Sequence, residues 1–98
     1  MKEITVADVR ARQAAGEKLT ILDVRNPDER EEASIEGTLF IPLPELEDRF
    51  AELNEYKDQE LIIHCRSGKR SASACMYLEL QGFTNVVNLQ GGIMAWMQ

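Results

Sequence analysis

Short apolar runs alternate with segments of helical character along the sequence, and this alternation restricts the possible folds most. A short extended piece begins at Ile4, and four later apolar runs are predicted strands. These predicted strands are Leu19–Val24, Leu39–Ile41, Leu61–Cys65 and Val86–Leu89. Because parallel strands need crossover connections, which are usually helices, the alternation predicts an α/β domain with a mostly parallel sheet.

Five other segments are predicted helices. They are Val6–Gly16, Pro27–Ala33, Leu43–Leu53, Lys69–Leu80 and Ile93–Trp96. The third is amphipathic, because its apolar residues recur at helical spacing with acidic residues between them. The fourth is apolar on most sides and is expected to pack deeply. No linker or internal repeat interrupts the pattern, so residues 1–98 are predicted to form a single domain.

Composition and charge exclude several classes of protein. No apolar run approaches the roughly 20 residues of a membrane helix, and the first residues lack the apolar stretch of a signal peptide. We therefore expect a cytoplasmic protein with no membrane partner. The net charge of -6 disfavours nucleic acid as a partner. Between Leu61 and Ser71, however, there are three cations and no acid, which indicates a site for an anion.

Two cysteines, Cys65 and Cys75, are too few for a disulfide scaffold, and their spacing suits no zinc motif. His64 is the single histidine, so neither a metal site nor another cofactor is expected. Cys75 lies within the predicted helix 69–80, too far along it to reach Cys65, because a disulfide needs Cα atoms within about 7 Å. It is interpreted as a packing residue.

The segment that carries chemistry is Cys65–Ser71, called here the Cys65 loop, between a predicted strand and a predicted helix. Parallel-sheet proteins form their sites beyond the carboxyl ends of strands, where Cys65 stands. Gly68 allows backbone N–H groups to converge at the helix start, and Lys69 and Arg70 add positive charge. These features predict a lowered pKa for the Cys65 thiol and a cradle for an anion or a persulfide.

The length of the loop separates two kinds of cysteine chemistry. Cysteine-dependent phosphatases have five residues between the cysteine and an arginine, whereas four residues separate Cys65 from Arg70. The shorter ring of N–H groups should fit a sulfur atom better than a phosphoryl group. A cysteine phosphatase or arsenate reductase therefore stays a secondary alternative, as does a cationic turn that only starts a helix.

Four further residues are interpreted as structural. His64 should point to the opposite face of its strand from Cys65, because side chains alternate along a strand. Asp23 is expected to bond backbone groups of a loop, and Arg25 to pair with an acid. Trp96 is expected to anchor the core.

Three segments together resemble the rhodanese family, over nearly the whole chain. The first signature comprises Leu22-Asp23-Val24-Arg25, Pro27, Glu29, Ile35-Glu36-Gly37-Thr38 and Ile41-Pro42. The Cys65 loop resembles the active-site loop of the family. The closing segment comprises Gly82-Phe83-Thr84-Asn85-Val86, Leu89, Gly91-Gly92 and Trp96.

The resemblance implies a five-stranded, mostly parallel sheet flanked by helices on both faces. It also implies a sulfurtransferase that takes a sulfane sulfur from thiosulfate or a related donor as a persulfide on Cys65. Cyanide, a thiol, a thioredoxin-like protein or a sulfur-carrier protein would then accept the sulfur. The substrate-binding residues carried over by the resemblance are Arg66, Ser67, Gly68, Lys69, Arg70 and Ser71.

One pair of residues departs from the family pattern. Ala33-Ser34 stand where family members usually have Gly-His, which alters a local structural role but leaves the nucleophile in place. A binding or regulatory module of the same fold is the other alternative. Such modules usually lose the cysteine, whereas Cys65 and its loop are intact.

Overall fold

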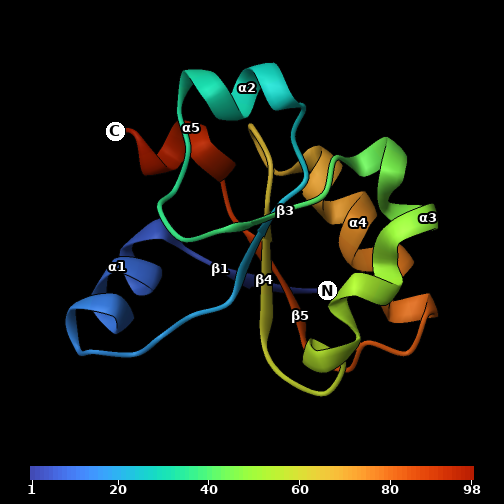
Figure 1. Ribbon diagram of the computed structural model, residues 1–98. Coiled ribbons are helices and arrows are strands. Elements are labelled where there is room, and N and C mark those ends of the chain that lie inside the picture. The colour runs from blue at the N-terminus through green and yellow to red at the C-terminus, as the bar shows by residue number, and fades with distance from the viewer.

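The computed structural model describes all residues, 1–98, and its centre is a five-stranded parallel sheet (Figure 1). Its strands stand in the order β1-β5-β4-β2-β3. Their bounds are β1 Lys2–Ile4, β2 Ile21–Asp23, β3 Leu39–Phe40, β4 Leu61–His64 and β5 Val86–Leu89. This arrangement confirms the predicted α/β class and the parallel sheet.

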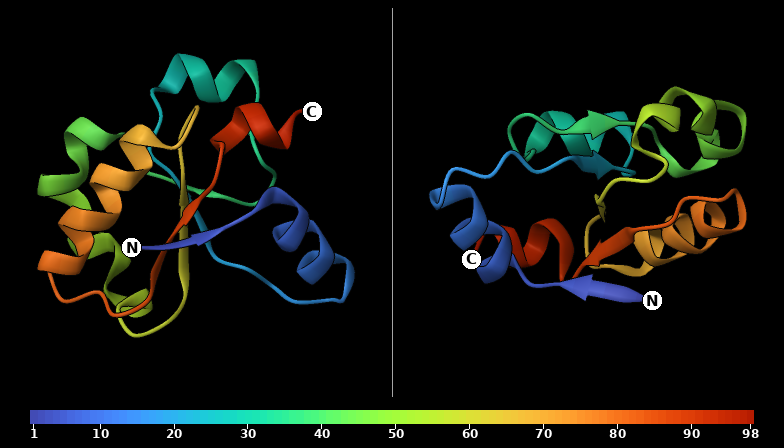
Figure 2. Two further views of the ribbon diagram at one scale, coloured as in Figure 1. Left: turned by 180° about the vertical axis from the view of Figure 1, so that it is seen from behind. Right: turned by 90° about the horizontal axis from the view of Figure 1, so that it is seen from below.

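The helices cover both faces of the sheet (Figure 2). Their bounds are α1 Val6–Ala14, α2 Pro27–Glu32, α3 Leu46–Arg49, α4 Lys69–Leu80 and α5 Gly92–Trp96, with 3-10 helices η1 Leu43–Glu45 and η2 Phe50–Tyr56. Each α-helix lies within a predicted helical segment or, in the case of α5, extends it by one residue. No helix has the length and apolar character needed to cross a membrane.

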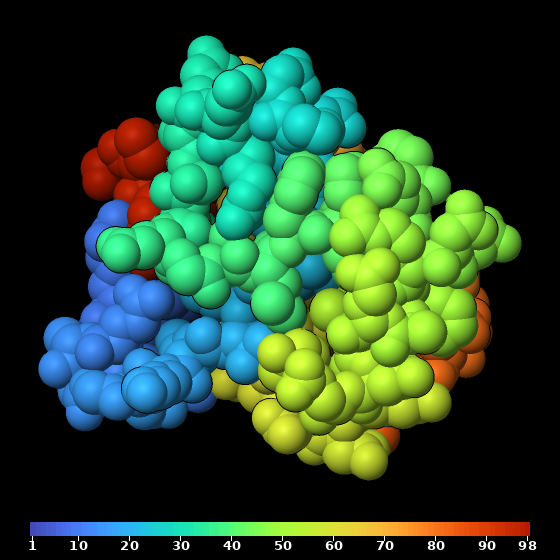
Figure 3. Space-filling view, viewed as in Figure 1, coloured from blue at the N-terminus to red at the C-terminus, as the bar shows by residue number.

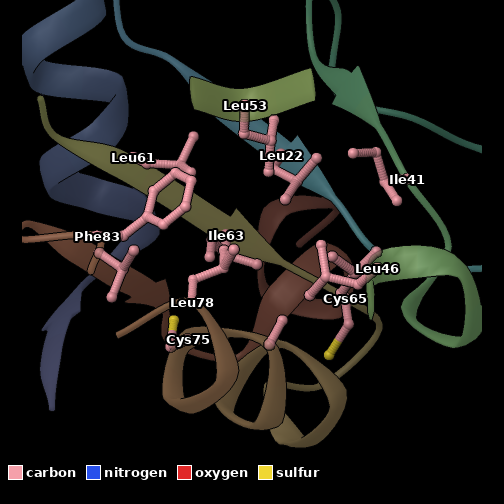
Figure 4. Packing of buried hydrophobic residues seen from close by; sticks show 13 residues of the cluster. Leu22, Ile41, Leu46, Leu53, Leu61, Ile63, Cys65, Cys75, Leu78 and Phe83 are labelled. Carbon is pink, nitrogen blue, oxygen red and sulfur yellow. The ribbon is translucent and has the colours of Figure 1, made fainter. Parts of the chain in front are cut away.

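The central strand β4 shows why a single apolar run fits between two helical layers. All four of its residues are buried. Leu61 and Ile63 belong to the core cluster that includes Ala74, Cys75 and Leu78 of α4, and Figure 4 shows several members of this cluster. Ile62 belongs to a second cluster on the other face, packed against α1 and α5. Because a strand buried on both faces has no side chain in contact with solvent, its residues form a nearly continuous apolar run in the sequence.

The prediction of one helix over Leu43–Leu53 was wrong. The segment forms η1, one short turn of α3 and then η2. Its buried residues, Leu46 and Leu53, still face the core cluster of α4. Apolar spacings of three and four residues suit both an α-helix and a 3-10 helix, so the pattern identified the buried face but not the type of helix.

The predicted strand Leu19–Val24 is shorter than expected, because ladder pairing is confined to Ile21–Asp23. The strands β2 and β4 run in the same direction, with Asp23 opposite His64. Their carboxyl ends therefore meet at one edge of the sheet. Helices α2 and α5 lie beside this edge in both Figure 1 and Figure 2, and Figure 3 shows their surfaces next to each other.

Candidate active site

Cys65 follows β4 directly, and its side chain is turned toward the first turns of α4 (Figure 4). The residue is only 1% exposed. Its sulfur is nevertheless surrounded by polar groups: the Gly68 N–H donates to it at 3.1 Å, and the Ser71 Oγ lies 3.3 Å away. A buried sulfur with hydrogen-bond donors is held in one place rather than only packed.

The environment of the sulfur acts on its ionisation in two opposite ways. Burial raises the pKa of the Cys65 thiol. Hydrogen bonds from the Ser71 hydroxyl and from nearby backbone N–H groups lower it by more, so the pKa of Cys65 lies below the ordinary value. The lowered pKa agrees with the direction expected from the sequence, and the largest causes that lower it are hydrogen bonds from the Ser71 hydroxyl and from backbone N–H groups.

Gly68 gives the loop the curvature that brings the N–H groups together. Its φ of 111° lies in the left-handed region, which a residue with a side chain adopts only with strain. Its carbonyl oxygen accepts a hydrogen bond from the Asn88 Nδ2 at 3.1 Å. Asn88 also accepts the hydroxyl hydrogen bond of Ser71 through its Oδ1. A buried residue of β5 thus contacts the loop at two points.

The outer side of the loop is held by α5. Ile93 donates its backbone N–H to the Cys65 carbonyl at 2.9 Å, and Met94 donates to the Arg66 carbonyl at 3.1 Å. A Cβ on Gly92 would lie 2.5 Å from the Cys65 carbonyl oxygen. The loop therefore approaches the start of α5 so closely that only glycine fits there.

The three cations of the loop differ in their surroundings. Arg70 forms a bidentate ion pair with Glu29 of α2, with both N···O distances at 2.7 Å. Glu29 therefore balances the charge of Arg70. The side chains of Arg66 and Lys69 are exposed and form no hydrogen bond or ion pair. Of the three loop cations, these two have no ion-pair partner.

A buried ionic group supports the sheet edge behind Cys65. The carboxylate of Asp23 accepts hydrogen bonds from the Arg25 backbone N–H and side chain at 2.9–3.0 Å, and from Arg30 at 3.2 Å. His64 is fully buried, with its Nε2 3.8 Å from Asp23 and its Nδ1 3.2 Å from the Cys65 carbonyl. The Arg25 guanidinium also donates to the Ala33 carbonyl at 2.7 Å. These contacts fit the structural roles predicted for Asp23 and Arg25.

Two other predicted structural residues lie away from the sulfur of Cys65. Cys75 is a free, buried thiol on α4, and burial raises its pKa to about 12. Trp96 packs against the second core cluster, and the Arg10 guanidinium lies 3.8 Å from the centre of its ring. Both residues have the packing environment expected of them.

A cavity of about 380 Å³ lies beside the loop, between α2 and α5. Arg66 belongs to both the cavity wall and the Cys65 loop. The remaining wall combines apolar side chains of α5 with polar groups near α2. The full lining is Arg25, Glu29, Glu32, Ala33, Arg66, Ile93, Met94 and Met97.

The fold and the loop define a class of protein, and comparison with known proteins places the chain in it. Residues 5–98 match the model of the rhodanese-like domain. A sulfurtransferase of Allochromatium vinosum is 38% identical over 96 residues, which cover 98% of this chain and 88% of that protein. The chain belongs to the rhodanese-like domain family.

Solved structures agree with this assignment. A rhodanese-like domain protein from Staphylococcus aureus matches with a TM-score of 0.87 and 33% identity, over 98% of this chain and 91% of that one. The human single-domain sulfurtransferase TSTD1 matches with a TM-score of 0.82 and 27% identity, over 99% of this chain and 96% of the human chain. Together these relatives support sulfurtransferase activity for this chain.

Sequence reasoning missed three residues that hold the site together. Asn88 interrupts the apolar run of β5, and a polar residue in a buried strand is a signal that it meets a polar partner. Gly92 was interpreted only as part of a turn. Glu29 was noted only for its resemblance to the family signature, and nothing in the sequence pairs it with Arg70.

Proposed function

We propose that this chain is a single-domain sulfurtransferase that carries a sulfane sulfur as a persulfide on Cys65. The observation that carries the proposal is the surroundings of the Cys65 sulfur. This sulfur accepts a hydrogen bond from the Gly68 N–H at the start of α4, and it lies beside the Ser71 hydroxyl. Such a position stabilises negative charge on sulfur. The same cradle suits the terminal sulfur of a persulfide, which is also anionic.

In the first half-reaction, the Cys65 thiolate attacks the outer sulfur of thiosulfate. A bond forms between the Cys65 Sγ and that sulfur, and the sulfur–sulfur bond of thiosulfate breaks. Sulfite leaves with the bonding electron pair, and the negative charge of the persulfide rests on its terminal sulfur. The exposed Arg66 and Lys69 attract the anionic donor.

In the second half-reaction, a nucleophilic acceptor such as cyanide or a thiolate attacks the terminal sulfur. The persulfide bond breaks, and the Cys65 thiolate is restored as the leaving group. The cavity between α2 and α5 is the proposed approach for the acceptor, because it shares Arg66 with the loop. A thioredoxin-like or sulfur-carrier protein would present its nucleophile from the same side.

The decisive experiment is intact-mass spectrometry of the reduced protein after incubation with thiosulfate, beside the Cys65→Ser variant. We expect the parent protein to gain one sulfur atom, to lose it on addition of a thiol, and Cys65→Ser to gain none. Cys75→Ser is the matched control, because its buried thiol, with a pKa raised to about 12, should not react. A persulfide on Cys75, or full activity of Cys65→Ser, would overturn the mechanism.

Two further assays separate the alternatives. A polysulfide donor tests whether a lack of reaction with thiosulfate reflects only the wrong donor. Hydrolysis of an aryl phosphate that disappears in Cys65→Ser would instead indicate a phosphatase. If neither donor loads Cys65 and no phosphate is released, a binding module becomes the better description.

A further inference from the structure

Asn88 joins two parts of the Cys65 loop from a neighbouring strand. It is 4% exposed, its Nδ2 donates to the Gly68 carbonyl, and its Oδ1 accepts from the Ser71 hydroxyl. The orientation of the amide follows from these partners. If the amide were turned over, its oxygen would face the carbonyl oxygen of Gly68, and two acceptors would meet without a hydrogen between them.

The Ser71 hydroxyl has one hydrogen and two neighbours that can accept it. One neighbour is the Oδ1 of Asn88 and the other is the sulfur of Cys65, 3.3 Å away. While Cys65 is a thiol, its S–H can donate to the Ser71 oxygen and the Ser71 O–H can donate to Asn88. In this state the Cys65 thiol, the Ser71 hydroxyl and the Asn88 amide oxygen each have a hydrogen-bond partner.

Ionisation of Cys65 disturbs this order. The thiolate has no hydrogen to donate and is stabilised by hydrogen bonds that it accepts. The Ser71 hydroxyl can donate to the thiolate only if its hydrogen turns away from Asn88. The O–H bond of Ser71 stays intact, and the thiol proton leaves to solvent or to a base. The amide oxygen of Asn88 then loses its donor inside the protein, which costs free energy.

We propose that Asn88 is a positioning residue that holds the Ser71 hydroxyl hydrogen while Cys65 is a thiol and yields it to the sulfur when the thiolate forms. The inference rests on the proposed role of Cys65 as the nucleophile. Asn88 thereby opposes the thiolate through Ser71, while its amide hydrogen keeps Gly68 in place. It restrains the reactivity of the sulfur without touching it.

The charged and titratable groups around the sulfur are independent of Asn88. Arg66, Lys69 and Arg70 belong to the loop, and Glu29 of α2 neutralises Arg70. Of the elements that pack against the loop, β4 carries His64, with Asp23 beside it. The other titratable or charged groups on these elements are Cys75, Tyr77 and Glu79 on α4, and Asp28, Arg30, Glu31 and Glu32 on α2. None of them forms a hydrogen bond with Asn88, so replacing Asn88 leaves these pairings unchanged.

The test is a double-mutant cycle on the Cys65 pKa, with Asn88→Leu and Ser71→Ala made singly and together. The thiolate is followed by its ultraviolet absorbance against pH, and the Cys65→Ser titration is subtracted to remove other groups. With Ser71 present, we expect Asn88→Leu to lower the midpoint by about one pH unit, the size of one redirected hydrogen bond. In the Ser71→Ala background, Asn88→Leu should not lower it.

Asn88→Asp provides a contrast of opposite sign. Like leucine, aspartate cannot donate to the Gly68 carbonyl, but its carboxylate accepts the Ser71 hydrogen strongly and adds negative charge. We therefore expect Asn88→Asp to raise the midpoint. A role confined to anchoring Gly68 would move the midpoint in the same direction in both variants, because both lose that anchor.

The proposal is overturned if Asn88→Leu leaves the midpoint unchanged or raises it, or if the shift is equal with and without Ser71. Asn88→Ala removes the same two polar groups and gives the same test if the leucine variant does not fold. The titration uses no sulfur donor. A protein that forms no persulfide would contradict the proposed function, yet its thiol would still report whether Asn88 acts through Ser71.

Discussion

Gly92 is the residue where the backbone tolerates least change. Its φ is +56°, and an added Cβ would lie within 2.5–2.7 Å of atoms of the Cys65 and Arg66 backbone. We expect Gly92→Ala to lower the free energy of unfolding by about 2–4 kcal/mol, because backbone strain and a clash with other backbone add together. Sulfur transfer should fall as well, since the loop has to move. Urea unfolding and the persulfide assay measure the two effects.

Gly37→Ala is the matched control for this prediction. Gly37 has a similar φ of +79°, but an added Cβ there would meet nothing within 4 Å. Gly37→Ala should therefore lower the free energy of unfolding only through backbone strain, by about 1–2 kcal/mol, and should leave sulfur transfer unchanged. If both alanine variants lost the same stability and activity, the contact between Gly92 and the loop would have no special role.

The sequence predicted individual site residues where the residue type and its neighbours in the sequence already indicated a chemical role. Cys65 and Gly68 stood out because a cysteine at a strand end, a cluster of cations and a glycine-containing turn before a helix occur together less often than any one of them alone. Asn88 and Gly92 act through contacts with residues far away in the chain. Only the packing of β5 and α5 against the loop reveals what they do.

At the scale of elements, the ion pair between Glu29 and Arg70 links α2 to the start of α4. Both side chains are partly exposed, 22% and 33%, so solvent screens the pair. We expect Glu29→Gln to lower the free energy of unfolding by up to about 1 kcal/mol near neutral pH. Glu45→Gln, which breaks a more exposed pair with Arg49 within one segment, should cost less.

The difference in the free energy of unfolding between the parent protein and Glu29→Gln should depend on pH in one direction. Arg70 lowers the pKa of Glu29 to about 2, against an ordinary value of 4.5. The stabilisation is therefore complete above pH 4.5 and is lost as the pH falls toward 2. Parent and Glu29→Gln should differ by a constant amount from pH 7 to 5 and converge below that range. A difference that vanished already at pH 6 would show that another group governs the contact.

Elements differ in how well their sequence determines them. The bounds of α4 were predicted residue for residue, because a glycine, an apolar body and a second glycine after its end all agree. The segment 43–53 was mistaken for one helix, because spacings of three and four residues cannot separate an α-helix from a 3-10 helix. The order of the strands in the sheet was not predicted, because the apolar runs do not indicate which strands pair with each other.

At the scale of the whole molecule, acid should weaken the fold through its only histidine. Burial lowers the pKa of His64 below 6.5 despite the nearby Asp23 carboxylate. The unfolded chain then binds a proton at higher pH than the folded chain does, so stability falls as the pH drops below 6.5. Nuclear magnetic resonance of the single imidazole should give a midpoint below 6.5, and urea unfolding should show lower stability at pH 5 than at pH 7.5.

Replacement of Asp23 checks the cause of this effect. Asn at this position removes the charge that favours the imidazolium, so Asp23→Asn should lower the midpoint of His64 further. A midpoint above 6.5 in the parent protein would mean that the carboxylate outweighs burial. Asp23 itself has a pKa below 3.8, where burial is outweighed by the hydrogen bonds from Arg25, so a second loss of stability is expected below that pH.

The contacts made by β5 and α5 also have a consequence for synthesis of the chain. The first strand of the sequence pairs with β5, and the loop carbonyls of Cys65 and Arg66 receive their donors from Ile93 and Met94. A nascent chain on the ribosome therefore cannot complete the sheet or close the loop until residue 94 has emerged. Cys65 leaves the exit tunnel nearly thirty residues earlier, and during that interval its thiol lacks the folded surroundings described above. The thiol would then react as an ordinary cysteine does, and it would acquire its lowered pKa only after residue 94 has emerged and the loop has closed.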